Sequence, residues 1–197
     1  MQIDFRMTLP VLVMFVLMIL LPFFNFFSPD FVRWIEHFQA MLLIFFACFT
    51  YFYMQPLQLE AGDKYFWLWA VCWWILLFGR SISWGRDYFP DVPRVYYRIL
   101  SICFIAPILG FFFSADFRTE LKRKIQAFVL PFWTFVLVVT SIIIADAIEH
   151  ERVLSSLFID GLTYQDLMEE LYEFPIIIGL FLLAWSLMKK EKQRLLE

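Results

Sequence analysis

Six long apolar segments set the strongest limit on what this chain can fold into. They cover residues 7–27, 31–54, 64–80, 95–113, 125–146 and 174–188. Most of them approach the roughly 20 apolar residues that a helix needs to cross a bilayer. Since 62% of the chain is hydrophobic, a soluble fold could not bury so much apolar surface. The sequence therefore predicts an all-α, polytopic integral membrane bundle of about six transmembrane helices.

The segment before the last apolar run has a different pattern. Asp166, Glu169, Glu170 and Glu173 recur at i, i+3, i+4 and i+7, so a helix places them on one face. We therefore predict a short amphipathic helix that leads into the last span. Since no long linker interrupts the chain, residues 1–197 are expected to form a single transmembrane domain.

The distribution of basic residues predicts the orientation of this bundle. With six spans, both termini and the loops at 54–64 and 114–124 share one side, which holds most of the Lys and Arg residues. Loops rich in Lys and Arg stay on the cytoplasmic side of a membrane. We expect a multi-pass protein of the plasma (inner) membrane with both termini in the cytoplasm.

The two histidines of the chain each follow a glutamate, in Glu36-His37 and Glu149-His150. Both dipeptides fall at ends of apolar segments on the predicted outer side. Asp146, Glu149 and His150 stand at i, i+3 and i+4, so a continuing helix shows them on one face. Ionisable groups at the membrane suggest a functional site. We predict one outward-facing polar pocket with these five residues as candidate catalytic groups.

Arginines gather between the third and fourth apolar segments, on the same predicted side. A charge near the hydrocarbon boundary is costly unless it is paired, and arginine binds phosphate and carboxylate groups bidentately. We expect Arg80 or Arg86 to pair with Asp146, Glu149 or the acidic helix, or to clamp an anionic substrate. For Trp84 alone we favour a membrane-interface anchor. The predicted substrate-binding residues are Arg80, Ser83, Trp84, Arg86, Arg98, Glu169, Glu170 and Glu173.

Two kinds of chemistry fit such a pocket. His37, His150 and Glu149 supply ligands that a divalent metal such as zinc accepts, although the chain has no HExxH motif. Without a metal, a Glu-His pair can act as a general base beside a phosphate held by arginines. Both versions predict a membrane hydrolase or transferase that binds or processes an anionic lipid or a lipid-linked substrate.

A non-enzymatic function is the alternative. The same polar residues could form an ion-pair network that holds the helices in register, or a docking face on a membrane subunit or assembly factor. The expected partners are membrane lipid and, on this alternative, another membrane protein; nucleic acid is not expected. A cavity around His37, His150 and Arg80 would favour an enzyme, and full pairing of these residues would favour a structural network.

Overall fold

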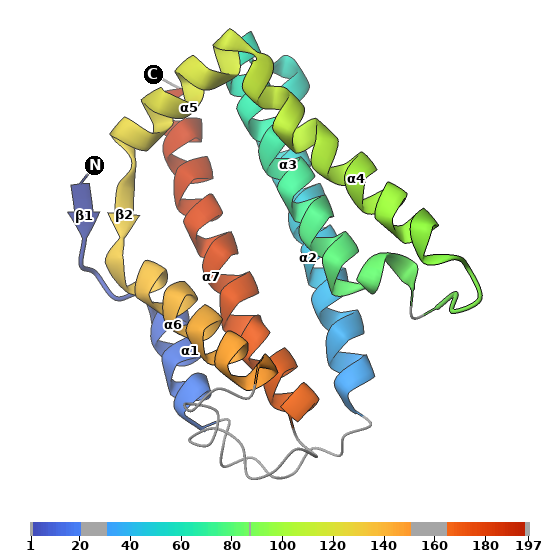
Figure 1. Cartoon of the computed structure of the whole chain (residues 1–197). Coiled ribbons are helices and arrows are strands. Elements are labelled where there is room, and N and C mark those ends of the chain that lie inside the picture. The colour runs from blue at the N-terminus through green and yellow to red at the C-terminus, as the bar shows by residue number, and fades with distance from the viewer. Residues whose placement is uncertain (1, 21–30, 87, 151–164, 196–197) are drawn as a thin grey trace. The chain divides into compact units, whose positions relative to one another are not determined.

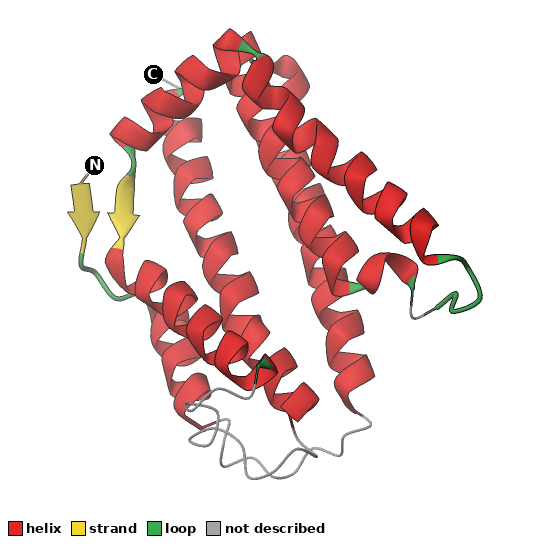
Figure 2. Ribbon diagram, viewed as in Figure 1, coloured by secondary structure: helices red, strands yellow, loops and turns green. Residues whose placement is uncertain are grey.

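The computed structural model describes residues 2–20, 31–86, 88–150 and 165–195, which are almost entirely helical (Figure 1, Figure 2). The elements are β1 (Gln2–Asp4), α1 (Leu9–Leu20), α2 (Val32–Met54), η3 (Pro56–Gln58), α3 (Ala61–Ser81), η4 (Ser83–Gly85), α4 (Arg94–Gly110), η5 (Phe111–Phe113), α5 (Ala115–Ala127), β2 (Val129–Pro131), α6 (Phe132–Glu149) and α7 (Gln165–Arg194). The predicted all-α class is confirmed.

Four helical stretches of the described residues are long and apolar enough to cross a membrane, which indicates a membrane protein. They are Val32–Gln58, Arg94–Phe113, Phe132–Glu149 and Gln165–Arg194. α1 is apolar but has 12 residues, and residues 21–27 of its predicted span lie outside the described residues. α3 has 21 residues, but its tryptophans and the charges of Asp63 and Lys64 lower its mean hydropathy.

Two helix boundaries differ from the sequence prediction. The helix predicted over 125–146 is divided, because α5 ends at Ala127, β2 follows, and α6 begins at Phe132. Pro131 explains the break, since proline donates no backbone hydrogen bond and favours extended backbone at the preceding residue. The predicted amphipathic helix and last span instead form one helix of 30 residues, α7, which accommodates Pro175.

The chain divides into two compact units. The first contains Met1–Glu36 and Val129–Lys190, and the second contains His37–Phe128 and Glu191–Glu197. The last turn of α7 therefore belongs to the second unit.

The first unit packs α1, α6 and α7 around one apolar core. Its buried residues are Val11, Met18, Leu137, Ile144, Ala145, Ile148, Met168 and Tyr172. The Tyr172 hydroxyl donates to the carbonyl oxygen of Met18 at 3.0 Å, which ties α7 to α1. A Cβ at Gly179 would overlap Val138, so glycine permits the close approach of α7 to α6. β1 and β2 form a parallel pair, which the sequence did not predict.

The second unit is built on an antiparallel pair, α3 and α4, which lie side by side in Figure 1. Tyr65, near the start of α3, contacts Phe111 just beyond the end of α4 with ring centroids 6.3 Å apart. Trp84, beyond the end of α3, contacts Phe104 at 5.5 Å. The unit therefore has two ends, which the rise of α3 separates by roughly 26 Å between residues 63 and 80.

Candidate functional site

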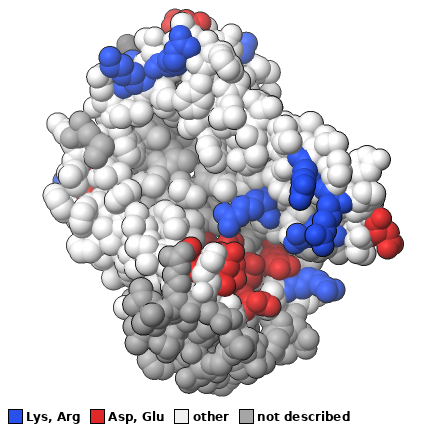
Figure 3. Space-filling model, viewed as in Figure 1, with Lys and Arg blue, Asp and Glu red and all other residues white. Residues whose placement is uncertain are grey.

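Four arginines, Arg80, Arg86, Arg94 and Arg98, lie at one end of the second unit, which we call the arginine end. Arg80 is in the last turn of α3, Arg86 follows η4, and Arg94 and Arg98 lie in the first turns of α4; all four are exposed. Figure 3 shows basic side chains gathered over the start of α4. In the part of the second unit that the structure describes, Arg80, Arg94 and Arg98 form no ion pair.

A left-handed turn at the arginine end holds Trp84. Ser83, Trp84 and Gly85 have φ angles of 48°, 57° and 87°, a region that non-glycine residues rarely adopt. A Cβ added at Gly79 would overlap the Trp84 ring, which also packs 5.5 Å from the ring of Phe104. Gly79 therefore makes room for the indole that fixes this turn between Arg80 and Arg86.

His37 joins the same end of the second unit. Its Nε2 lies 2.9 Å from the hydroxyl of Tyr88, and the two rings meet edge to face with centroids 5.7 Å apart. This contact links the beginning of the second unit to the loop before α4. The imidazole that was predicted to be catalytic is thus hydrogen-bonded to a phenol.

The other predicted histidine lies at the end of α6, in the first unit. His150 Nδ1 is 3.6 Å from Asp146 Oδ1 and 3.8 Å from Glu149 Oε2, so the helix brings these three side chains together as their spacing predicted. All three are at least 40% exposed, so water screens their charges. Because His37 belongs to the other unit, the shared pocket and the shared metal site stay predictions.

The acidic face predicted on Asp166–Glu173 lies on α7 in the first unit. Asp166 is exposed, whereas Glu169, Glu170 and Glu173 are half-buried and engaged in contacts of their own. Their predicted pairing with Arg80 or Arg86 of the second unit stays a prediction.

A buried ion-pair network, which the sequence did not predict, occupies the opposite end of the second unit. Its carboxylates are Asp63, Glu120 and Glu191, and its cations are Arg123, Lys124 and Arg194. They come from the first turn of α3, from α5 and from the last turn of α7. The network therefore joins three segments that lie far apart in the sequence.

Lys124 lies at the centre of this network. Its Nζ is 2.9 Å from Asp63 Oδ1, 3.0 Å from Glu120 Oε1 and 2.6 Å from Glu191 Oε2. The Lys124 side chain is 5% exposed, so these carboxylates take the place of water around its charge. The rings of Phe66 and Trp67 lie 4.8 and 5.4 Å from the same nitrogen and add cation–π contacts.

Two arginines complete the network. Arg194 Nη2 donates to Asp63 Oδ2 at 2.5 Å and also contacts Glu191. Arg123 Nε donates to Glu120 Oε2 at 2.7 Å, and this hydrogen bond, with the nearby negative charges, raises the pKa of the Arg123 guanidinium. Burial by itself raises the pKa of Asp63, but hydrogen bonds with Glu120, Lys124 and Arg194 and the charge of Lys124 hold it well below its ordinary value.

The three carboxylates have the donor type that a divalent cation accepts, since their ligand oxygens lie within 4.8 Å of one another. However, the Lys124 ammonium already contacts all three, and three cations balance three anions. The charges of this network therefore balance one another, as expected of a structural junction between α3, α5 and the last turn of α7.

The network predicts a defined pH dependence of stability. Because folding lowers the pKa of Asp63, its contribution is fully present well above its ordinary value of 3.8 and is lost progressively as the pH falls from that value towards the lowered pKa of the folded state. We expect the melting temperature in detergent to fall as the pH is lowered from about 5 to about 3, and the Asp63→Asn variant to show a flatter profile over this range. The exposed Asp91→Asn is the control; a profile for Asp63→Asn as steep as that of this control would contradict the prediction.

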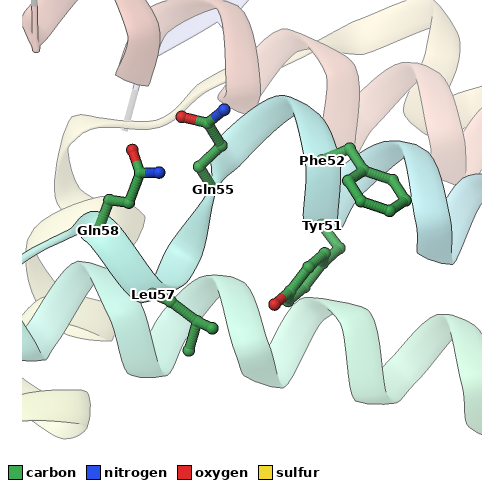
Figure 4. A pocket seen from close by; sticks show the side chains of 5 residues that line it. All are labelled: Tyr51, Phe52, Gln55, Leu57 and Gln58. Atoms are coloured by element: carbon green, nitrogen blue, oxygen red, sulfur yellow. The ribbon is translucent and has the colours of Figure 1, made fainter.

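An open depression of about 230 Å³ lies where α2 meets η3, lined by Tyr51, Phe52, Gln55, Leu57 and Gln58. Figure 4 shows Tyr51 extending towards Leu57, while the amide groups of the two glutamines point away from them. Its lining residues include neither a histidine nor a carboxylate, so it differs in composition from the polar pocket that the sequence predicted.

No protein family, no protein of characterised function and no solved structure matches this chain. Its function is therefore inferred from the geometry of its own residues. Two groups stand out among those described: the arginine end, where Arg80, Arg94 and Arg98 form no ion pair within the described part of their unit, and the buried network, whose charges are balanced.

Proposed function

We propose that this chain is a multi-pass membrane protein that binds a phosphate-bearing anionic lipid, or a lipid-linked phosphate, at its arginine end. The observation that carries the proposal is that Arg80, Arg94 and Arg98 are exposed and form no ion pair within the described part of their unit. Clustered cations repel each other unless an anion neutralises their charge. A phosphate group that accepts bidentate hydrogen bonds from arginine is such an anion.

The start of α4 adds to this attraction. Its N-cap residue is Pro93, no side chain caps the helix, and its first turn contains no acidic residue. Unpaired N–H groups and the helix dipole make such an N-terminus favourable for anions. Arg94 and Arg98 are one turn apart on this helix, so their charges add to the field of the dipole instead of cancelling it.

The surroundings of the arginine end match headgroup depth. α4 is apolar and exposed along most of its length, with Ile108 as its only buried residue, so its surface suits lipid. Trp84, Tyr88 and Tyr96 lie beside the arginines, and Trp and Tyr are enriched where a bilayer meets water. Lipid phosphates lie at the same depth.

The proposal extends to topology. We assign six spans to the six apolar segments in the plasma membrane; the basic loops then favour cytoplasmic termini, and the arginine end faces outward. Hydrolysis or group transfer of the bound headgroup, with His37 near the arginines as a base, is the enzymatic form of the same proposal. The alternative, a non-enzymatic subunit, is favoured by one observation: the network around Lys124 is internally balanced.

Removing two arginines tests the proposal. For the Arg94→Gln/Arg98→Gln variant we expect affinity for phosphatidylglycerol in nanodiscs, relative to phosphatidylcholine, to fall by at least about tenfold, as the loss of one charge-assisted hydrogen bond predicts. Lys189→Gln/Lys190→Gln removes the same charge elsewhere and should bind like the unaltered protein. Inorganic phosphate as a competitor separates recognition of phosphate alone from recognition of the whole lipid. Equal affinities of the two double variants would contradict the proposal.

A further inference from the structure

The outer face of α5 carries two basic side chains and one apolar side chain in a stripe. Arg118, Lys122 and Ile125 stand at i, i+4 and i+7 and are exposed. The opposite stripe, Phe117, Glu120 and Lys124, is buried and contains part of the ion-pair network. The inner face of α5 is thus buried within the second unit, whereas the three residues of its outer face are exposed.

An exposed aromatic pair precedes this helix. Phe112 and Phe113 of η5 are 42% and 87% exposed, although two adjacent exposed phenylalanines would be costly in water. The Arg118 guanidinium donates to the carbonyl oxygens of both, at 2.7 and 3.1 Å. A positive charge is therefore held at the backbone of two exposed phenylalanines.

The position of this pair relative to α4 fixes its depth. α4 is one of the stretches long and apolar enough to cross a membrane, and that stretch ends at Phe113. The next helix, α5, begins with a Ser114 cap and turns away from the direction of α4 in Figure 1. The phenylalanines therefore stand where hydrocarbon gives way to headgroups, and α5 leaves along that boundary.

We propose that η5 and α5 form a membrane-surface anchor that lies in the interface of an anionic leaflet. Phe112, Phe113 and Ile125 enter the region of the acyl chains, and Arg118 and Lys122 contact lipid phosphates. Apolar and basic residues in this combination are typical of helices that lie in the interface. Figure 3 shows basic side chains over α5 as well as over the start of α4.

This anchor is independent of the proposed arginine end. The two surfaces lie at opposite ends of α3, so they meet opposite leaflets of the same bilayer. Charge complementarity with acidic phospholipid headgroups is the reason for choosing lipid as the occupant, since each Lys or Arg near an anionic surface strengthens binding.

A depth measurement tests the anchor in the full chain in nanodiscs. After the native cysteines Cys48, Cys72 and Cys103 are replaced by alanine, a spin label is placed at Phe113→Cys or, as the control, at Asp91→Cys in the exposed loop before α4. We expect oxygen to reach the label at position 113 and a water-soluble nickel chelate to be excluded, with the opposite result at position 91. A label at position 113 that is as accessible to nickel as the control would overturn the proposal.

Lipid composition tests the phosphate contacts separately. With a label at Ile125→Cys, phosphatidylglycerol should immobilise α5 more than phosphatidylcholine does. The Arg118→Gln/Lys122→Gln variant should need roughly fivefold more phosphatidylglycerol for each charge removed. An unchanged phosphatidylglycerol requirement in this variant would overturn the contacts with phosphate. The Arg94→Gln/Arg98→Gln variant should leave the mobility of the label at position 125 unaffected. A failure of the proposed lipid site at the arginine end can therefore be distinguished from a failure of the anchor.

Discussion

Replacing Lys124 with methionine is expected to lower the free energy of unfolding by about 3–5 kcal/mol, the usual cost of leaving a buried charge without its partner. The ammonium contacts Asp63, Glu120 and Glu191 within 3.0 Å, and methionine keeps much of the side-chain volume while removing the charge. Three buried carboxylates would then face two arginines. Denaturant unfolding of the purified protein in detergent measures the effect.

Two further variants make this experiment specific. Lys122→Met removes the same charge from the exposed side of the same helix and should change the free energy of unfolding by less than about 0.5 kcal/mol. Adding Asp63→Asn to Lys124→Met restores two anions against two cations and should recover part of the loss. If Lys124→Met proved as stable as Lys122→Met, the network would not be a stabilising junction.

Phe117→Ala is expected to destabilise the second unit by a similar amount, about 3–5 kcal/mol, because it empties a filled site in the core. Phe117 is 0% exposed, and its ring lies 5.2 Å from Phe112 and 5.5 Å from Trp69. This contact fastens α5 to α3 beneath the ion pairs. Thermal unfolding followed by near-ultraviolet circular dichroism would report the loss through the tryptophan signals.

Phe113→Ala is the matched control for this change. It removes the same ring four residues earlier, where the side chain is 87% exposed. In detergent it should alter the free energy of unfolding by about 0.5 kcal/mol or less. Similar losses for the two variants would mean that burial of the ring does not determine its contribution.

Local patterns were enough to predict the all-α class and the grouping of side chains on one helix, but not α5, which forms where a loop at 114–124 was predicted. Long apolar runs gave the all-α class, and helical spacing correctly placed Asp146, Glu149 and His150 together at the end of α6. Such features depend on residues within two turns of each other. Their geometry follows from the helix repeat and needs no knowledge of the rest of the fold.

Long-range pairing was beyond the reach of those patterns. Asp63 and Arg194 are 131 positions apart, and neither spacing nor composition indicates that they bond. The basic loops did predict that the segments of Asp63, Lys124 and Arg194 share one side, but their cations were taken as topology signals and not as partners. Glu120 with Lys124 at i+4 and Glu191 with Arg194 at i+3 were the local signs of pairing.

The break before α6 was missed for a related reason. Residues 125–146 are apolar enough for one helix, and proline by itself is tolerated inside a membrane-spanning helix. Gln2–Asp4 pairs with Val129–Pro131, so the extended conformation at the proline is supported by a distant partner strand. Tertiary pairing here overrides the local preference for helix.

The composition of the Lys124 network has a consequence for biosynthesis. Asp63, Glu120, Arg123 and Lys124 contain equal numbers of opposite charges, and so do Glu191 and Arg194. The ribosome makes the second group after the first, so the nascent chain already holds a neutral half-site before Glu191 and Arg194 are added. The pair of Glu191 and Arg194 is itself neutral, and its docking therefore adds no net charge to the network.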